Sequence, residues 1–342
     1  MKGLFFQVLV LVSNATIAQP IVFRASDVPV NSSFRAMSMP DDQVAWIAGS
    51  RGWIGRSLDG GTQWKFFRIG NDSTADYRTL YAQDSLRAIV ANTGSPALIH
   101  RTTDGGRTWS VVYRNDHPDA FLDGAGFWDD QNGIIYGDPI GGHLMLIGTQ
   151  DGGNTWVPYP ETSRPAVITG EASFAASQTT LRCSGKSDVW IATGGVRASL
   201  FHSTDRGLTW DRSDTPMASG KPGAGIFSIC LVGRKRIALA GGDYQSPRET
   251  TGVYCYQDSP GSAWKTTATG PGGYRSIIEI SRDGLMIASG PGGTDVSTDR
   301  GEHWKGVSGA PNINVIGKSR KGNRLIAAGK NRIWMIMSGG GN

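Results

Sequence analysis

Residues 57–64 read Ser-Leu-Asp-Gly-Gly-Thr-Gln-Trp, and close copies of this octet begin at residues 102, 149, 203 and 297. A sixth, degenerate copy runs over residues 256–264, with an extra residue between its Asp and its Trp. The aspartates of the six copies lie at positions 59, 104, 151, 205, 258 and 299, at intervals of 41 to 54 residues. A period of this length indicates an array of similar supersecondary units.

The residue types of the octet suit a tight turn that leads into a buried strand. A carboxylate two residues after a Ser or Thr can accept hydrogen bonds from turn amides, and glycines tolerate positive φ. The Trp that follows can begin the next strand and bury its ring. The octet resembles the Asp-box, or BNR, repeat S-x-D-x-G-x-T-W, which joins the outer two strands of a β-propeller blade. We therefore assign these aspartates to the fold and not to catalysis.

Each repeat reads as four short strands. In the first repeat we expect strands over residues 33–39, 43–48, 52–58 and 64–68. The second repeat runs over 77–113 and the third over 121–157, and the next three begin near Glu171, Gly225 and Tyr274. Their middle strands are apolar runs, which is typical of sheets that are covered on both faces.

The two ends of the chain predict how the array closes. After the sixth octet the sequence still holds three strand-like runs, 313–317, 324–328 and 333–337. The run 20–25 near the N-terminus can supply the missing fourth strand and cover the last sheet edge. The sequence therefore predicts an all-β fold, a seven-bladed β-propeller with Asp-box turns that is closed by its N-terminal strand.

The N-terminus has the pattern of an export signal. Lys2 precedes an apolar run over residues 4–12, and small residues at Thr16 and Ala18 favour cleavage after Ala18. We expect a signal peptide over 1–18 and one propeller domain over 19–342. No other run is long enough to span a bilayer, so we expect a periplasmic or secreted protein without a membrane span, and a monomer.

Charge and cysteine content argue against several kinds of site. Lys and Arg number 34 against 29 Asp and Glu, and they are interspersed, whereas nucleic-acid binders gather basic residues on one face. Cys183, Cys230 and Cys255 have no metal-type spacing, and no dinucleotide fingerprint is present. We expect no nucleic-acid partner, no metal and no cofactor.

Beyond the octets, the chain resembles exported propellers related to the photosystem II stability/assembly factor family, some of which are labelled oxidoreductases. The resemblance covers almost the whole mature chain and is carried by the segments 137–139 (GDP), 170–177 (GEASFAAS), 241–244 (GGDY) and 273–276 (GYRS). It implies a binding or assembly module and not a particular reaction, because propellers host unrelated functions.

A candidate site follows from the repeat. The face opposite the octets collects the starts of the innermost strands, and three of these starts carry an arginine at the same position: Arg35, Arg78 and Arg275. Guanidinium groups bind carboxylates or phosphates through paired hydrogen bonds. We expect an anionic group to be held by these arginines, with Asp138, Tyr244 and Tyr274 as further ligand-binding residues. The candidate acid/base or orienting groups are Glu171, Asp123 and Asp243. The alternative is a ring of internal ion pairs that only joins the blades.

Three functions fit this pattern. The first is a binding or assembly module of the cell envelope that holds an envelope protein, a glycan or an anionic small molecule at the axial mouth. The second is a hydrolase or lyase acting on an anionic carbohydrate through the same arginines and carboxylates. The third is a structural surface protein. A sialidase is disfavoured, because those enzymes have six blades and an F-R-I-P segment that residues 22–25 and 67–70 match only in part.

Overall fold

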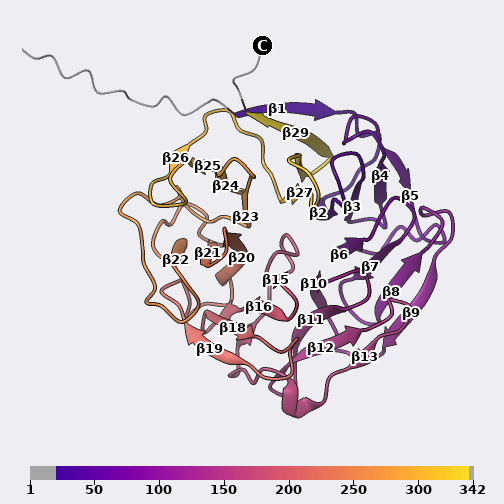
Figure 1. Ribbon diagram of the computed structural model, residues 1–342, viewed down its shortest axis with the longest axis horizontal. Helices are drawn as coiled ribbons and strands as arrows, with labels where there is room; N and C mark the ends of the chain where they lie inside the picture. Colours follow the sequence, from indigo (N-terminus) through magenta and orange to yellow (C-terminus); the bar gives the residue numbers. More distant parts are fainter. Residues whose placement is uncertain (1–20, 339–342) are drawn as a thin grey trace, which may run out of the picture.

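The computed structural model describes residues 21–338, and these residues form seven antiparallel sheets arranged as a ring (Figure 1). The innermost strands of neighbouring sheets contact one another all the way round, including the first and the last sheet. The predicted seven-bladed all-β propeller is confirmed. The expected signal peptide, residues 1–18, lies outside the described residues.

Each blade is a short antiparallel sheet whose strands follow one another outward from the axis (Figure 1). Blade one comprises β2 (Phe34–Ser38), β3 (Ala45–Gly49), β4 (Ile54–Ser57) and β5 (Lys65–Phe67). Blade two comprises β6 (Tyr77–Ala82), β7 (Ala88–Asn92), β8 (Ala97–Thr102) and β9 (Ser110–Asn115). Blade three comprises β10 (Leu122–Phe127), β11 (Gly133–Ile140), β12 (His143–Thr149) and β13 (Val157–Pro158). Blade six comprises β23 (Ile277–Ile280), β24 (Met286–Gly290), β25 (Gly293–Ser297) and β26 (Lys305–Gly306).

The N-terminal strand closes the ring as the sequence predicts. Blade seven consists of β27 (Val315–Lys318), β28 (Leu325–Gly329) and β29 (Arg332–Ser338), with β1 (Ile21–Ser26) as its outermost strand. All six residues of β1 pair antiparallel with β29. The sheet edge that β29 would otherwise expose is therefore covered by the other end of the chain.

Blades four and five depart from the expected pattern. Blade four comprises β15 (Leu181–Ser184), β16 (Asp188–Ala192), β18 (Ser199–Ser203) and β19 (Asp211–Asp214), and blade five comprises β20 (Ala224–Val232), β21 (Arg236–Asp243) and β22 (Tyr254–Gln257). The expected fourth strand of blade five is reduced to an isolated bridge between Tyr256 and Lys265.

The innermost strand of blade four does not run on from Glu171. Glu171 begins only the two-residue strand β14 (Glu171–Ala172), which pairs with β17 (Gly194–Gly195), and regular pairing resumes at Leu181. Residues 173–180 between these points leave the sheet, and we call this segment the plug. Two glycines make room for it, because a Cβ on Gly194 or Gly225 would lie within 2.7 Å of the ring of Phe174.

The repeated turns have the hydrogen bonds that their residue types predict. The Oγ of Ser57 donates to Oδ1 of Asp59 at 2.8 Å, and the amide of Gln63 donates to the same oxygen at 2.9 Å. Gly60 and Gly61 have φ values of 72° and 91°, which favour glycine. The amide of Gln63 is the largest cause that lowers the pKa of Asp59. Equivalent bonds form at Asp104, Asp151, Asp205 and Asp299.

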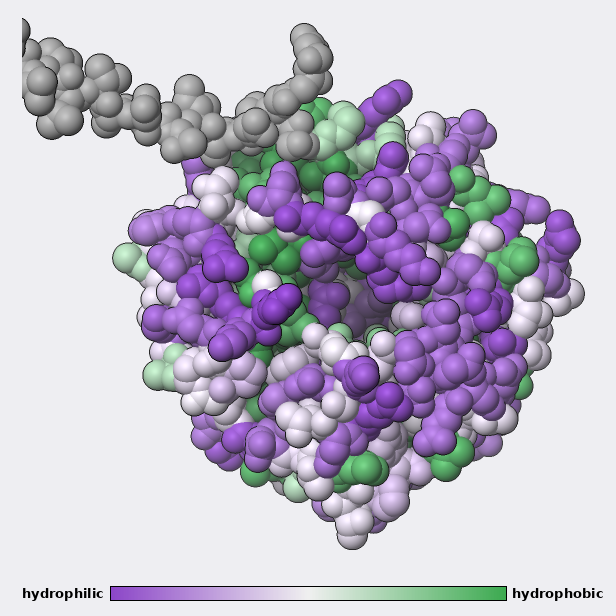
Figure 2. Space-filling model, in the orientation of Figure 1, coloured by the Kyte–Doolittle hydropathy of each residue, from purple (hydrophilic) through white to green (hydrophobic). Residues whose placement is uncertain are grey.

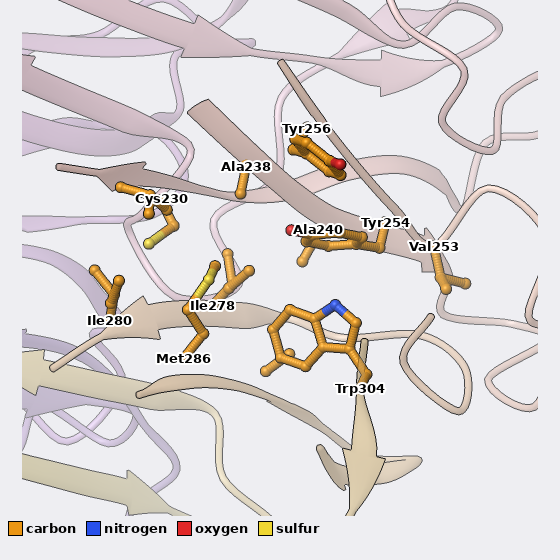
Figure 3. Packing of buried hydrophobic residues seen from close by; sticks show 12 residues of the cluster. Cys230, Ala238, Ala240, Val253, Tyr254, Tyr256, Ile278, Ile280, Met286 and Trp304 are labelled. Carbon is orange, nitrogen blue, oxygen red and sulfur yellow. The ribbon is translucent and has the colours of Figure 1, made fainter. Parts of the chain in front are cut away.

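The tryptophans of these turns join neighbouring blades. Trp304 of blade six packs edge-on against Tyr254 of blade five, with ring centres 5.1 Å apart, beside Met286 and Ile278 (Figure 3). Trp156 of blade three likewise contacts the core that contains Ile89 of blade two. Each octet Trp packs against the core that its blade shares with the preceding one, so the repeats depend on one another for their cores.

Candidate functional site

The plug crosses the axis of the ring and is bonded to most of the other blades. The side-chain amide of Gln178 donates to the carbonyl of Met37 in blade one at 3.0 Å and accepts from the amide of Leu80 in blade two at 2.9 Å. Ser177 donates to the carbonyl of Ser276 in blade six at 2.7 Å. These bonds join residues that are 98 to 141 positions apart in the chain.

Further bonds tie the plug to blades three and five. The amide of Ser173 donates to Oδ1 of Asp138 at 3.0 Å, and Thr179 donates to Oγ of Ser228 at 2.7 Å. The plug therefore divides the axial channel into two parts. We call the side of the repeated turns the turn face, and the side of Arg35 and Arg78 the opposite face. In the view of Figure 2, the ring is hollowed at its axis and hydrophilic residues gather around the hollow.

Arg35 and Arg78 lie close together on the opposite face. Nε of Arg78 donates to Oδ2 of Asp76 at 2.8 Å. Arg35 takes part in none of the ion pairs of the described residues, and its one hydrogen bond goes to the carbonyl of Ala176 in the plug, at 3.5 Å. Burial and the nearby charge of Arg78 lower the pKa of Arg35. The structure thus brings together two of the three predicted arginines and leaves one without a carboxylate.

Arg275 is not available in the way that the sequence suggests. Its side chain is 2% exposed, and its Nε donates to Oδ2 of Asp295 at 2.7 Å. Nη1 of Arg275 also donates to the carbonyl of Tyr274. The prediction that all three arginines share one ligand is therefore wrong for Arg275, which forms an internal ion pair with Asp295. The reason is Asp295, which β25 places beside the guanidinium and which the repeat does not reveal.

Two of the three candidate acid/base groups are engaged in the fold. Glu171 is 3% exposed, and it accepts from Thr193 at 2.6 Å and from Arg212 at 2.9 Å. Asp243 is buried and accepts from the amide of Gln245 at 2.9 Å. These contacts hold turns and strand ends in place, and they leave neither carboxylate free to exchange protons with a bound substrate.

Asp123 is the third candidate and lies fully inside the protein. It is 0% exposed, and neither of its carboxylate oxygens has a hydrogen-bond partner. Burial and the charge of Asp138 raise the pKa of Asp123 well above its usual range, against an opposing effect of Arg78. Burial also raises the pKa of Asp138. Burial therefore favours the protonated form of both carboxyl groups.

We expect Asp123→Asn to stabilise the protein at pH 8. The raised pKa means that the folded chain keeps a proton that the unfolded chain releases, so stability falls as the pH rises from the unfolded to the folded pKa of Asp123. The amide does not titrate, so it removes this pH-dependent penalty, which is about 1.4 kcal/mol for each pH unit above the unfolded pKa until the folded pKa is reached. Urea unfolding from pH 4 to pH 8 measures it.

The gain should shrink toward pH 4, close to the pKa of an unfolded Asp, where about half of the unfolded chains also keep the proton. Asp27→Asn is the matched control, because Asp27 is exposed, and it should leave the free energy of unfolding within about 0.5 kcal/mol of the parent at every pH. A loss of stability in Asp123→Asn at pH 8 would show that the carboxylate is charged and paired.

Aromatic side chains lie beside the arginines on the opposite face. Phe174 of the plug stacks on Phe227, with ring centres 4.1 Å apart, and Tyr274 meets Phe227 edge-on at 4.8 Å. Tyr274 is buried, whereas Tyr244 is 49% exposed. Of the two predicted tyrosines, only Tyr244 therefore presents its ring to solvent.

A separate cavity of about 430 Å³ lies on the axis at the turn face. Its wall includes Ser177, Gln178 and Thr179 of the plug, and the ends of the innermost strands. None of the nine residues predicted for the site lines it. The repeat predicts a functional mouth on the opposite face only, so the sequence interpretation missed this cavity.

The sequence interpretation missed two partners of the predicted site residues, Asp76 and Arg212, and only the first could have been found from the sequence. Asp76 stands two residues before Arg78, so a local carboxylate partner could have been found. Arg212 lies 41 residues from Glu171 on the outermost strand of blade four, and nothing in the sequence joins the two.

Among residues 21–338, no group of three or more His, Cys, Asp or Glu could hold a metal ion. No described helix is long and apolar enough to cross a membrane.

Comparison with known proteins agrees with this geometry. The model of the family described as "Photosynthesis system II assembly factor YCF48" matches residues 16–119. The structure titled "YCF48 bound to D1 peptide" superposes with a TM-score of 0.68 at 14% identity, over 95% of this chain and 98% of that one. This chain is therefore similar to YCF48 in its fold. YCF48 from Cyanidioschyzon merolae gives a TM-score of 0.66 at 15% identity, over 92% of this chain and 98% of that one.

The YCF48-like fold also extends to enzymes. The GH74 xyloglucanase from Xanthomonas campestris gives a TM-score of 0.62 at 13% identity. The match covers 92% of this chain and 53% of the xyloglucanase. At identities this low, these structures show a shared fold and not a shared activity. No curated protein matches the sequence.

Proposed function

We propose that this YCF48-like propeller is a binding and assembly module, and that its opposite face holds an acidic segment of a partner protein. The observation that carries the proposal is Arg35, a largely covered guanidinium with no carboxylate partner among the described residues, beside a second arginine. A related fold, YCF48, has a structure in complex with a peptide. That complex supports a protein segment as the ligand class.

The two arginines differ in how their charges are balanced. Arg78 is compensated by Asp76 at 2.8 Å, whereas Arg35 has only a long bond to a carbonyl. A carboxylate that approaches Arg35 meets a cation that has already lost much of its water, so the new ion pair has a small further desolvation cost. The exposed ring of Tyr244 offers apolar contact on the same face.

The same contacts favour binding over catalysis. Asp123 is closed to solvent and Glu171 is held by Arg212, so the predicted carboxylates do not form an exposed pair of the kind a glycoside hydrolase requires. A glycan or an anionic small molecule would use the same arginine.

The sequence pattern at residues 1–18 supports a periplasmic or secreted site of action. Fractionation of cells that express the full chain tests this localisation.

We expect Arg35→Gln to weaken binding of acidic peptides at least tenfold, because the variant loses a charge-assisted contact. Octapeptides selected from a random library on the full chain serve as probes, and fluorescence polarisation measures their dissociation constants. Amide analogues, with Asn and Gln in place of Asp and Glu, should bind as weakly to the parent as the acidic peptides bind to the variant.

Arg114→Gln is the matched control, since Arg114 is an exposed arginine on β9 that pairs with Asp116. It should leave the affinity unchanged. Peptides that bind Arg35→Gln as well as they bind the parent would overturn the proposal, as would peptides that bind equally well as their amide analogues.

A further inference from the structure

The cavity at the turn face has an apolar wall on one side and a basic wall on the other. We call this cavity the turn-face chamber. Its volume is about 430 Å³, and it is defined by the residues that line it. The plug forms its floor, and both polar atoms of the Gln178 side chain are already used to bond blades one and two. The plug therefore lies between the chamber and Arg35, which bonds the carbonyl of Ala176 on the opposite face. The volume is within the range of sites for small molecules.

Blades one to three supply an apolar wall. Tyr81 of β6 stacks on Phe127 of β10, with ring centres 3.9 Å apart and planes within 10° of parallel. Met37, Met39 and Leu80 continue this wall toward the plug. Both aromatic rings are only partly buried by the protein, so they still have surface that a ligand can cover.

Blades four, six and seven supply a basic wall. Arg182 is paired with Glu279 at 2.8 Å, and no other carboxylate lines the chamber. Arg282, Lys318 and Arg320 also line it, and none of the three forms an ion pair with another described residue. The chamber therefore holds three more positive charges than negative ones.

Arg320 is held in place by contacts that leave its charge uncompensated. Its Nη1 donates to the hydroxyl of Ser38 at 3.1 Å, its Nη2 donates to the carbonyl of Ala82, and its guanidinium lies 4.5 Å from the ring centre of Tyr81. Desolvation lowers the pKa of Arg320, and Tyr81, Asp130 and Asp41 oppose that effect. The side chain links the basic wall to the apolar wall.

We propose that the turn-face chamber binds a small organic anion, a carboxylate or phosphate on an apolar body. The anionic group lies against Lys318, Arg282 and Arg320, and the apolar body covers Tyr81 and Phe127. This site lies across the plug from Arg35. It does not depend on the peptide-binding function proposed above, and a variant of one site leaves the other intact.

Three probes with matched bodies or charges test the proposal on the full chain: 3-phenylpropionate, 3-phenylpropanol and inorganic phosphate. Isothermal titration gives the affinities, and NMR of ¹³C-methyl-labelled methionine reports the location. We expect saturable binding of 3-phenylpropionate and at least tenfold weaker binding of the other two. The methyl signals of Met37 and Met39 should shift, and those of Met217 and Met145, which do not line the chamber, should stay in place.

Variants of the two walls distinguish their contributions to binding, and a variant of the opposite face serves as the control. Lys318→Gln should weaken 3-phenylpropionate at least fivefold and leave 3-phenylpropanol unchanged, and Phe127→Leu should weaken both. Arg35→Gln, on the opposite face, should change neither. The proposal is overturned by the absence of saturable binding, by equal binding of the acid and the alcohol, by phosphate binding as tightly as the acid, or by shifts at Met217 and Met145 alone.

Discussion

We expect deletion of residues 21–26 to lower the free energy of unfolding by roughly 3–5 kcal/mol and to make the protein self-associate. Ile21 and Phe23 pack against the core between blades six and seven, and burial of such side chains contributes up to about 1.5–3 kcal/mol each. The deletion also exposes the edge of β29 over all six paired positions. Urea unfolding and size-exclusion chromatography measure the two effects.

Point variants show whether the inward side chains of β1 carry the effect. The strand alternates, so Ile21 and Phe23 face the core while Val22 and Arg24 are exposed. Phe23→Ala should cost about 1–3 kcal/mol, and Val22→Ala, the matched control, less than about 0.5 kcal/mol. A deleted chain that stays monomeric and as stable as the parent would show that blade seven does not need its fourth strand.

The second large effect concerns Gln178 in the plug, where we expect Gln178→Ala to cost roughly 2–4 kcal/mol. The change removes one bond to blade one, and it leaves the amide of Leu80 without its partner. A net hydrogen bond contributes about 0.5–1.5 kcal/mol, and an unsatisfied buried group costs about 1–3 kcal/mol. Hydrogen exchange at the amide of Leu80 should become faster, while exchange in β25, to which the plug forms no hydrogen bond among the described residues, should not change.

Gln178→Gly is the paired variant that separates hydrogen bonding from backbone conformation. Gln178 has a φ of 55°, a left-handed conformation that costs a residue other than glycine roughly 1–2 kcal/mol. The glycine variant loses the same hydrogen bonds but relieves this cost, so it should be more stable than the alanine variant by about 1 kcal/mol. If both variants match the parent, the plug is not a structural element.

The plug also explains why the two proposed sites can act independently. It contacts Arg35 through the carbonyl of Ala176 on one side, and it forms the floor of the turn-face chamber through Ser177 and Gln178 on the other. A ligand of one site does not reach the other through the axis. Loosening the plug by Gln178→Ala is therefore expected to affect both sites, whereas Arg35→Gln and Lys318→Gln each affect one.

The repeat alone determined the blades, their number and the role of the octet aspartates. The bonds that define each repeated turn, such as those of Ser57 and Gln63 to Asp59, span no more than four residues, so residue type and spacing encode them directly. Closure by residues 21–26 could also be predicted, because a count of strands leaves one sheet a strand short. The arginines at the starts of the innermost strands were found in the same way, by their position in the repeat.

Tertiary structure alone decided which of those arginines is free, where the plug runs and where the chamber opens. Asp295 neutralises Arg275 and Arg212 holds Glu171, through contacts that span 20 and 41 residues and follow no repeat. Gln178 bonds residues 141 and 98 positions away. Such pairings depend on how seven sheets pack around one axis, and the sequence of a single repeat carries no information about a partner in another blade.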